Sequence, residues 1–349
     1  MDFASDNTAG IAPAILEAIG KANEGFALGY GNDDATRRVE ARIAEIFERA
    51  CAVFLVPTGT AANALAIAHL SPPWGSVLCH AESHIAVDEC GAPEFFGGGL
   101  KLIGLKGEGG KVAAATLRPV LEDGQWGGPH HVSPSVLSLS QASECGTIYR
   151  VSEITELAEI AHKHGAALHM DGARLGNALA RMNVSPAEAT WKAGVDVLSF
   201  GATKGGAMAA EAVVFFDPAK AEGMQSRRKR GAQLVSKHRF IAAQFEAYLR
   251  DDLWLALARH ANAAADTLAA RLADAGLKPA WPVEANEVFV ALPIAIDARL
   301  RAAGASYYPW TTSSLARPAG ADHILVRLVT SFATTETEID RFATLLRSA

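Results

Sequence analysis

The segment 196–208, Asp-Val-Leu-Ser-Phe-Gly-Ala-Thr-Lys-Gly-Gly-Ala-Met, constrains the fold and the chemistry of this chain more than any other. An apolar run before Gly201 predicts a buried strand, and a second run over 210–216 predicts a strand that returns into the core. Lys204 stands between them, followed by two glycines. An ammonium group is costly to bury unless it is paired or neutralised, so a lysine next to a buried strand indicates a functional role. Lys204 could form an imine with an aldehyde cofactor, or it could be a surface lysine in a glycine-rich turn.

A second apolar run, over 166–170, ends at Asp171 and favours the first of these alternatives. Pyridoxal phosphate needs a lysine for its Schiff base and an acidic partner for its ring nitrogen. The acid keeps the ring protonated, so that the ring can accept electrons. The order of strand with Asp171, helix, and strand with Lys204 places both groups at the ends of neighbouring strands. Binding of this cofactor is therefore the favoured interpretation.

The cofactor's phosphate has a candidate site in the turn after an earlier strand. A strand is predicted over 52–56 and an apolar helix over 61–70, with Thr58, Gly59 and Thr60 in between. Free backbone N–H groups at the start of a helix, together with two hydroxyls, form a site for an anion. An ordinary capped turn is the alternative, but neither a Walker motif nor a GxGxxG fingerprint indicates a nucleotide.

The alternation of strands and helices predicts an α/β fold with a mostly parallel sheet, whose sites collect at the carboxyl ends of the strands. We expect an N-terminal segment over 1–20, a large cofactor-binding domain over 21–245, and a smaller C-terminal α/β domain over 246–349. In the smaller domain, Arg327 interrupts the apolar strand 324–330. It predicts either a bidentate clamp for a carboxylate or a structural salt bridge.

Composition narrows the classes of partner. A net charge of −6 argues against a general nucleic-acid surface, and no run reaches the roughly 18 apolar residues that span a bilayer. The four cysteines are scattered without a CxxC pair, so we expect a reducing, cytoplasmic compartment. His80 and His84 invite a metal interpretation, but the HExxH order and a third nearby ligand are missing, so we expect no metal.

Motifs that run along nearly the whole chain carry a resemblance to one family. They are Phe3-Ala-Ser-Asp-Asn7, Thr58-Gly-Thr-Ala-Ala-Asn63, Asp88-Glu-Cys-Gly-Ala-Pro-Glu-Phe-Phe96, His169-Met-Asp-Gly-Ala-Arg174, Thr190-Trp-Lys-Ala-Gly-Val-Asp-Val197, Thr203-Lys-Gly205 and Pro282-Val-Glu-Ala-Asn286. In this order they resemble the low-specificity L-threonine aldolases and their phenylserine aldolase relatives, which are fold-type-I pyridoxal-phosphate enzymes. The resemblance implies cleavage of β-hydroxy-α-amino acids such as threonine, allo-threonine or phenylserine to glycine and an aldehyde. A β-eliminating lyase or an amino-acid racemase on the same fold is the alternative.

The resemblance also implies a role for each matching residue. For the cofactor, it assigns Lys204 to the Schiff base, Asp171 to the ring nitrogen, Thr58, Gly59 and Thr60 to the phosphate, and His84 with Glu89 to the face of the ring. Arg174 is assigned to both cofactor and substrate, and Ser5 and Arg327 to the substrate carboxylate. Tyr30 is assigned to substrate binding from a loop at a subunit interface, and Lys237 to a neighbouring subunit's phosphate. A homodimer or homotetramer with shared sites is therefore expected. Some relatives carry a second histidine where Glu144 is the closest residue here. We therefore expect His84, directly or through water and aided by Glu89, to act as the base, ahead of Glu144.

Overall fold

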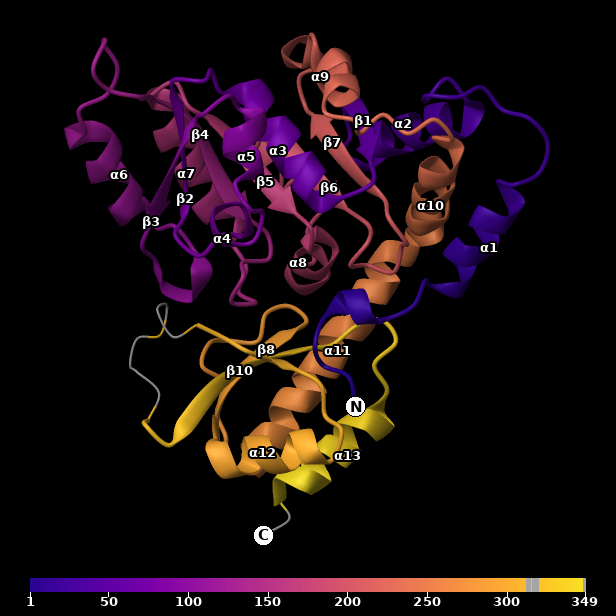
Figure 1. Cartoon of the computed structure of the whole chain (residues 1–349), viewed down its shortest axis with the longest axis vertical. Coiled ribbons are helices and arrows are strands. Elements are labelled where there is room, and N and C mark those ends of the chain that lie inside the picture. The colour runs from indigo at the N-terminus through magenta and orange to yellow at the C-terminus, as the bar shows by residue number, and fades with distance from the viewer. Residues whose placement is uncertain (312–314, 316–319, 348–349) are drawn as a thin grey trace.

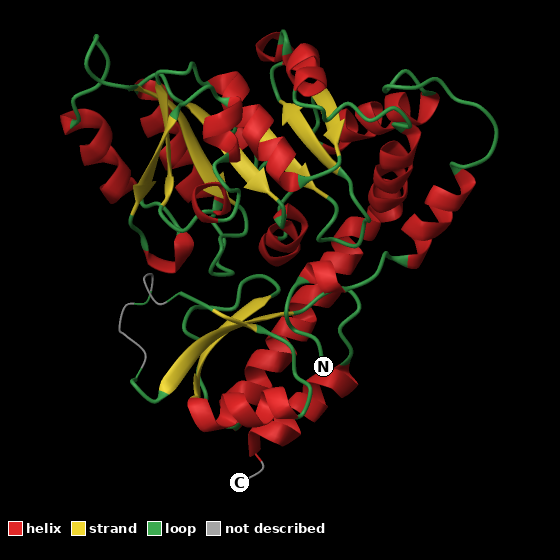
Figure 2. Ribbon diagram, in the orientation of Figure 1, coloured by secondary structure: helices red, strands yellow, loops and turns green. Residues whose placement is uncertain are grey.

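A mostly parallel sheet organises the larger part of the molecule in the computed structural model, which describes residues 1–311, 315 and 320–347 (Figures 1 and 2). The strand order is β1-β7-β6-β5-β4-β2-β3. β7 is antiparallel to both of its neighbours and the other adjacent pairs are parallel, which confirms the predicted α/β class. The strands are β1 (Ala52–Val56), β2 (Gly75–His80), β3 (Lys101–Leu105), β4 (Ser133–Ser140), β5 (Ala167–Gly172), β6 (Val197–Gly201) and β7 (Glu211–Phe215).

Helices cover both faces of this sheet, because successive strand residues point to opposite faces and both sets are apolar. On one face the strands pack against α1 (Pro13–Lys21), α2 (Asp34–Ile46), α6 (Ala114–Asp123), α7 (Val151–Lys163), α8 (Leu175–Met182) and α10 (Arg239–Leu249). On the other face they pack against α3 (Gly59–Leu70), α4 (His84–Val87), α5 (Ala92–Phe96) and α9 (Met224–Arg230).

A smaller sheet, in the order β8-β10-β9, lies below the main one in Figure 1 and has its own apolar core. Its strands are β8 (Glu287–Pro293), β9 (Tyr308–Pro309) and β10 (His323–Val329), and it packs with α11 (Leu253–Asp274), α12 (Ile294–Ala302) and α13 (Glu336–Arg347). The first residues of the chain join this core, since Phe3 is fully buried there and accepts a backbone hydrogen bond from Val329 at 2.8 Å. The division of the chain into domains stays a prediction.

The carboxyl ends of four adjacent parallel strands, β6, β5, β4 and β2, meet at one edge of the main sheet. Figure 1 shows this edge turned toward the smaller sheet. Chain segments that leave these strand ends therefore gather between the two sheets, as the sequence predicts. None of the helices within residues 1–311 and 320–347 has both the length and the apolar character needed to cross a membrane.

Candidate active site

Lys204 lies in the turn after β6 and lines two adjoining cavities between the sheets. The space beside Gly205 is filled by α10, because a Cβ atom there would lie 2.1 Å from the hydroxyl oxygen of Tyr248. Gly206 has a φ of +116°, which side chains rarely adopt. These glycines therefore serve the tight turn and its packing.

Asp171 lies at the end of β5, where it pairs in register with Ser199 of β6. Its two carboxylate oxygens accept hydrogen bonds, one from the Ala173 backbone N–H at 3.0 Å and one from Asn63 Nδ2 at 2.8 Å. Burial raises the pKa of this carboxyl, but the nearby charges of His84 and Lys204 outweigh burial and lower it. The site therefore holds a buried carboxylate that is ionised at neutral pH.

His84 begins α4 and lines both cavities. Its Nδ1 lies 2.8 Å from Glu89 Oε1, and the same oxygen accepts a hydrogen bond from Asn63 Nδ2 at 2.9 Å. Asn63 thus links the buried Glu89 to Asp171. The hydrogen bond to Glu89 is the main cause that raises the pKa of His84, although burial opposes it. His84 consequently keeps its ring proton to a higher pH than a free histidine does.

Arg174 and Arg327 reach the cavities from opposite sheets, but their charges are matched differently. Arg174 is buried and donates to both oxygens of Asp6, at 3.0 and 2.7 Å, and its Nη1 lies 3.3 Å from Glu287 Oε2. Arg327 stacks on Trp310, with its guanidinium carbon 4.5 Å from the ring centroid. Its Nε has no hydrogen-bond partner among the residues that the structure describes. Arg327 therefore keeps more donor capacity for an incoming carboxylate.

Most of the predicted site residues come together here. Both cavities are lined by Lys204, His84, Arg174 and Arg327. The inner cavity is the one that Asp171 and Glu144 also line, and the outer cavity is the one that Ser5 also lines. Within the described part of the chain, Glu89 lines neither cavity but is hydrogen-bonded to His84. Ser5 also has the local role of a cap, since its Oγ accepts from the Asn7 N–H at 3.2 Å.

The predicted phosphate residues Thr58, Gly59 and Thr60, at the start of α3, are not among the described residues that line these cavities, and neither are Tyr30 and Lys237. Tyr30 and Lys237 lie near each other, because the Tyr30 N–H donates at 3.1 Å to the carbonyl oxygen of Ser236, the residue before Lys237. Tyr30 is about half exposed. Their place is compatible with the predicted role toward a neighbouring subunit, which stays a prediction.

The sequence interpretation missed several residues that build the site. Asp6, Asn63 and Asn286 lie within the motifs quoted above, but the sequence predicted no role in the site for them; it indicated Asp6 only as a helix cap. Asn286 Nδ2 donates at 2.9 Å to the same Asp6 oxygen that Arg174 Nε contacts. Glu287 begins an otherwise apolar strand. A charged residue in an apolar strand is the same sequence signal that indicated Arg327, so Glu287 could have been predicted in this way. Trp310 carried no such signal, because a lone aromatic residue is ordinary in any core.

The residues fit pyridoxal phosphate in three respects. A lysine and a buried, ionised carboxylate lie after adjacent parallel strands, as the imine and the ring nitrogen require. Helix α3 starts with Gly59 and Thr60, and Thr58 caps it by accepting from the Ala61 N–H. The first N–H groups of a helix lack partners within it, so this turn suits a phosphate. Asn63, one turn further along α3, is hydrogen-bonded to Asp171 and so connects the phosphate turn to the carboxylate for the ring nitrogen.

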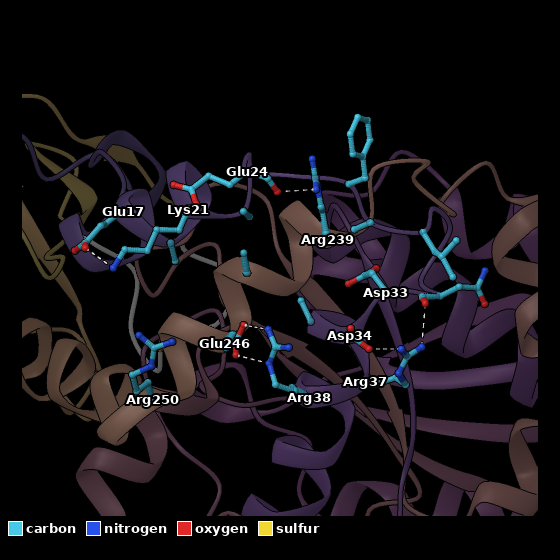
Figure 3. A pocket seen from close by; sticks show the side chains of 18 of the residues that line it. Glu17, Lys21, Glu24, Asp33, Asp34, Arg37, Arg38, Arg239, Glu246 and Arg250 are labelled. Atoms are coloured by element: carbon cyan, nitrogen blue, oxygen red, sulfur yellow. Dashed lines mark hydrogen bonds and ion pairs between the residues drawn. The ribbon is translucent and has the colours of Figure 1, made fainter.

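Another cavity lies between α1, α2 and α10, and charged side chains around it pair with one another (Figure 3). Arg38 donates to both oxygens of Glu246 at 2.7 and 3.0 Å, and Arg37 pairs with Asp34. Because these charges are matched within the chain, we place the active site at the cavities around Lys204.

Comparison with known proteins agrees with this geometry. The family model described as beta-eliminating lyase matches residues 2–295. The chain is 44% identical over 316 residues to the low specificity L-threonine aldolase of Pseudomonas aeruginosa, covering 90% of this chain and 91% of that protein. It is 42% identical to the enzyme of the same name from a Pseudomonas species, with the same coverage. A solved threonine aldolase from Leishmania major superposes with a TM-score of 0.92 at 29% identity, covering 99% of this chain and 98% of that one.

Proposed function

The chain belongs to the beta-eliminating lyase family, and on that premise we propose that it is a pyridoxal-phosphate-dependent aldolase that cleaves β-hydroxy-α-amino acids to glycine and an aldehyde. The observation that carries this proposal is the placement of Lys204, Asp171 and Arg327 around shared cavities, in a chain similar to low-specificity L-threonine aldolases over most of its length. The cytoplasmic location expected from the sequence stays a prediction.

The cofactor would be held by residues that the structure places around it. Lys204 would form the imine, Asp171 would bind the ring nitrogen, the start of α3 at Thr58–Thr60 would bind the phosphate, and His84 would lie on the ring. When bound, pyridoxal phosphate supplies a protonated ring that accepts the electron pair of a broken bond at Cα. Asp171 is ionised and buried, so it is suited to hold that ring proton in place.

The protein's own part in the reaction is to orient the substrate. Arg327 would bind the substrate carboxylate from the smaller sheet, with Ser5 and Arg174 beside it. Stacking on Trp310 restricts the guanidinium of Arg327 before a substrate arrives. A fixed carboxylate sets which bond at Cα stands perpendicular to the ring, and therefore which bond breaks.

The proposed function is tested by incubating the purified protein with L-threonine, L-allo-threonine and phenylserine. Glycine and the matching aldehyde should appear in equal amounts. Release of pyruvate and ammonia from serine without glycine would instead support a β-eliminating lyase, and formation of the D-amino acid without an aldehyde would support a racemase. Either of those results would replace the aldolase assignment.

Arg327→Ala is expected to weaken substrate binding by about 2 kcal/mol, which is the lower end of the range for truncating one partner of a charge pair. The lower end applies because Arg327 is only half-buried and Arg174 remains nearby. Side reactions such as transamination should rise relative to cleavage, because the bonds at Cα are oriented less strictly. The measurement is the KM for L-threonine together with the ratio of keto acid to glycine. Normal binding by this variant would make Arg327 a structural ion-pair residue.

We also propose that active sites are shared between subunits of a dimer or of a pair of dimers. The loop before α2 projects from the body of the molecule and exposes Phe26, Leu28 and Tyr30, which is unusual for three apolar side chains so close together (Figure 1). Lys237 lies beside this loop. A phosphate with about two negative charges needs more than one helix turn for neutralisation, and Lys237 of a second copy would supply a cation.

A mixture of Lys204→Ala and Lys237→Ala proteins is expected to regain activity after subunit exchange. Each hybrid dimer would contain one site with both residues intact, although neither parent contains any. The measurement is glycine release before and after exchange, with exchange followed independently by mass labelling of one variant. Exchange without any gain of activity would contradict the shared site.

A further inference from the structure

Glu144, in the loop after β4, is a partly buried residue whose carboxyl group the cofactor does not require. It lines the inner cavity together with Lys204 and Asp171. One oxygen, Oε1, accepts hydrogen bonds from the His84 backbone N–H at 2.8 Å and from Ser140 Oγ at 2.6 Å. The other oxygen, Oε2, is buried and has no hydrogen-bond partner among the residues that the structure describes. Such an atom is costly in a folded protein unless something else meets it.

The surroundings of Glu144 favour proton exchange near neutral pH. Burial raises the pKa of this carboxyl to about 7, while the bonds from Ser140 and His84 oppose the shift and the charge of Asp171 adds to it. The other charged or titratable groups that face the same cavity are Lys204, Arg174, Arg327, Glu287, Asp88 and the ring of His84. Cys79 and Tyr149 lie within electrostatic range of the carboxyl. Glu144 therefore changes its charge near neutral pH.

His84 holds its ring protons more tightly than a free histidine does. Its Nδ1 is committed to Glu89 at 2.8 Å, and this bond raises the pKa of the ring. At any pH where the ring carries both of its protons, it can act as an acid or a stacking partner but not as a base. Glu144 and His84 are nevertheless adjacent, since the Glu144 carboxylate accepts the backbone N–H of His84. Glu144 therefore lies in the part of the inner cavity where His84 was expected to accept the proton.

We propose that Glu144, through Oε2, takes the proton of the substrate's β-hydroxyl group as the Cα–Cβ bond breaks; this assignment rests on the proposed aldolase function. The O–H bond gives its proton to Glu144 and its electron pair to the new carbonyl group of the aldehyde. The Cα–Cβ bond breaks and its electron pair stays on the Cα side. A proton then returns to Cα, so the proton held by Glu144 balances the one taken up and no other reactant is needed.

Glu144→Gln tests this role, because glutamine keeps an oxygen for the His84 and Ser140 contacts but cannot accept the proton. Cleavage of L-threonine should slow by roughly 10²–10⁴-fold, which is the usual contribution of a positioned acid–base group. Glycine has no β-hydroxyl, so exchange of its α-proton with deuterated water should stay within a few-fold of the wild-type rate. Nuclear magnetic resonance measures this exchange on the same preparation, and it also shows that the variant folds and carries its cofactor.

Glu211→Gln is the matched control. Glu211 is also buried, and burial likewise raises the pKa of its carboxyl to about 7, but it faces the backbone of Thr203 and is not among the described residues that line the two cavities. The rate of cleavage in the wild type should rise with pH through about 7, as Glu144 loses its proton and becomes a base. That rise should persist in Glu211→Gln and vanish in Glu144→Gln.

A spectroscopic readout does not depend on turnover. Infrared absorption of protonated carboxyl groups in the intact enzyme should fall between pH 6 and 8, and each of the two variants should lack one part of that change. The proposal would be overturned if Glu144→Gln cleaved L-threonine at the wild-type rate, or if it lost cleavage and glycine exchange equally. It would also be overturned if the carboxyl of Glu144 did not titrate between pH 6 and 8. Loss of the pH-dependent rise in His84→Asn but not in Glu144→Gln would likewise overturn it. Failure of the wild type to cleave any β-hydroxy amino acid would instead refute the proposed function.

Discussion

Lys204→Ala is expected to lose the covalent cofactor link and, with it, the release of glycine and aldehyde. The amine of Lys204 reaches both cavities from the turn after β6, and the pocket residue that would hold the ring nitrogen, Asp171, lies on the adjacent strand. An alanine leaves no nitrogen for the imine, although the phosphate turn and Asp171 still bind the cofactor without a covalent bond. The measurement is borohydride reduction followed by mass spectrometry, which detects a stable adduct on Lys204 in the wild type.

Lys220→Ala is the control for this experiment. Lys220 is an exposed lysine whose amine pairs with Asp196 at 2.7 Å. We expect this variant to keep the reducible adduct, the yellow colour of the bound cofactor and the wild-type rate of glycine release. A reducible adduct that survives in Lys204→Ala would mean that another lysine forms the link, and the assignment of the site would fail.

The sheet and the positions of Lys204 and Asp171 were predictable because they depend on local sequence patterns. β5 and β6 are short, mostly apolar runs, and parallel pairing brings the residues at or just after their ends, Asp171 and Lys204, to one edge of the sheet. The start of α3 and the interruption of β10 by Arg327 follow from the same kind of signal.

The pairing of charges in the site was not predictable in this way. Arg174 and Asp6 are 168 positions apart in the chain, and only the packing of the N-terminal segment on the smaller sheet brings them together. The role expected for Arg174 toward the substrate carboxylate stays a prediction, but the structure shows that two acidic partners already share its guanidinium. Likewise, the burial that raises the pKa of Glu144 comes from segments far apart in the sequence, whereas the ranking of His84 ahead of it followed from the family resemblance.

The ion pair between Arg174 and Asp6 also connects the site to the stability of the fold. Both side chains are almost completely buried, and Asn286 donates a further hydrogen bond to Asp6. Burial raises the pKa of Asp6, but the charge and the hydrogen bond of Arg174 outweigh it and lower that pKa to about 2. The folded state therefore binds the Asp6 proton less tightly than the unfolded state. Its contribution to stability, about 2 kcal/mol, is present above about pH 4 and is lost as the pH falls toward 2.

Asp6→Ala is expected to lower the free energy of unfolding by about 3 kcal/mol, because it leaves the buried guanidinium of Arg174 with Glu287 as its remaining acidic partner. Unfolding in urea at pH 7 measures this loss, and repeating the experiment at pH 3 should show a smaller difference between variant and wild type, since the wild type has then lost part of the same contribution. Asp340→Ala is the control, because it removes an ion pair to Arg271 that is 2.9 Å long but exposed, and such pairs contribute about 0–1 kcal/mol. Equal effects of the two substitutions would show that the Arg174–Asp6 pair gains nothing from burial, and a difference that is the same at pH 3 and pH 7 would show that Asp6 does not titrate between them.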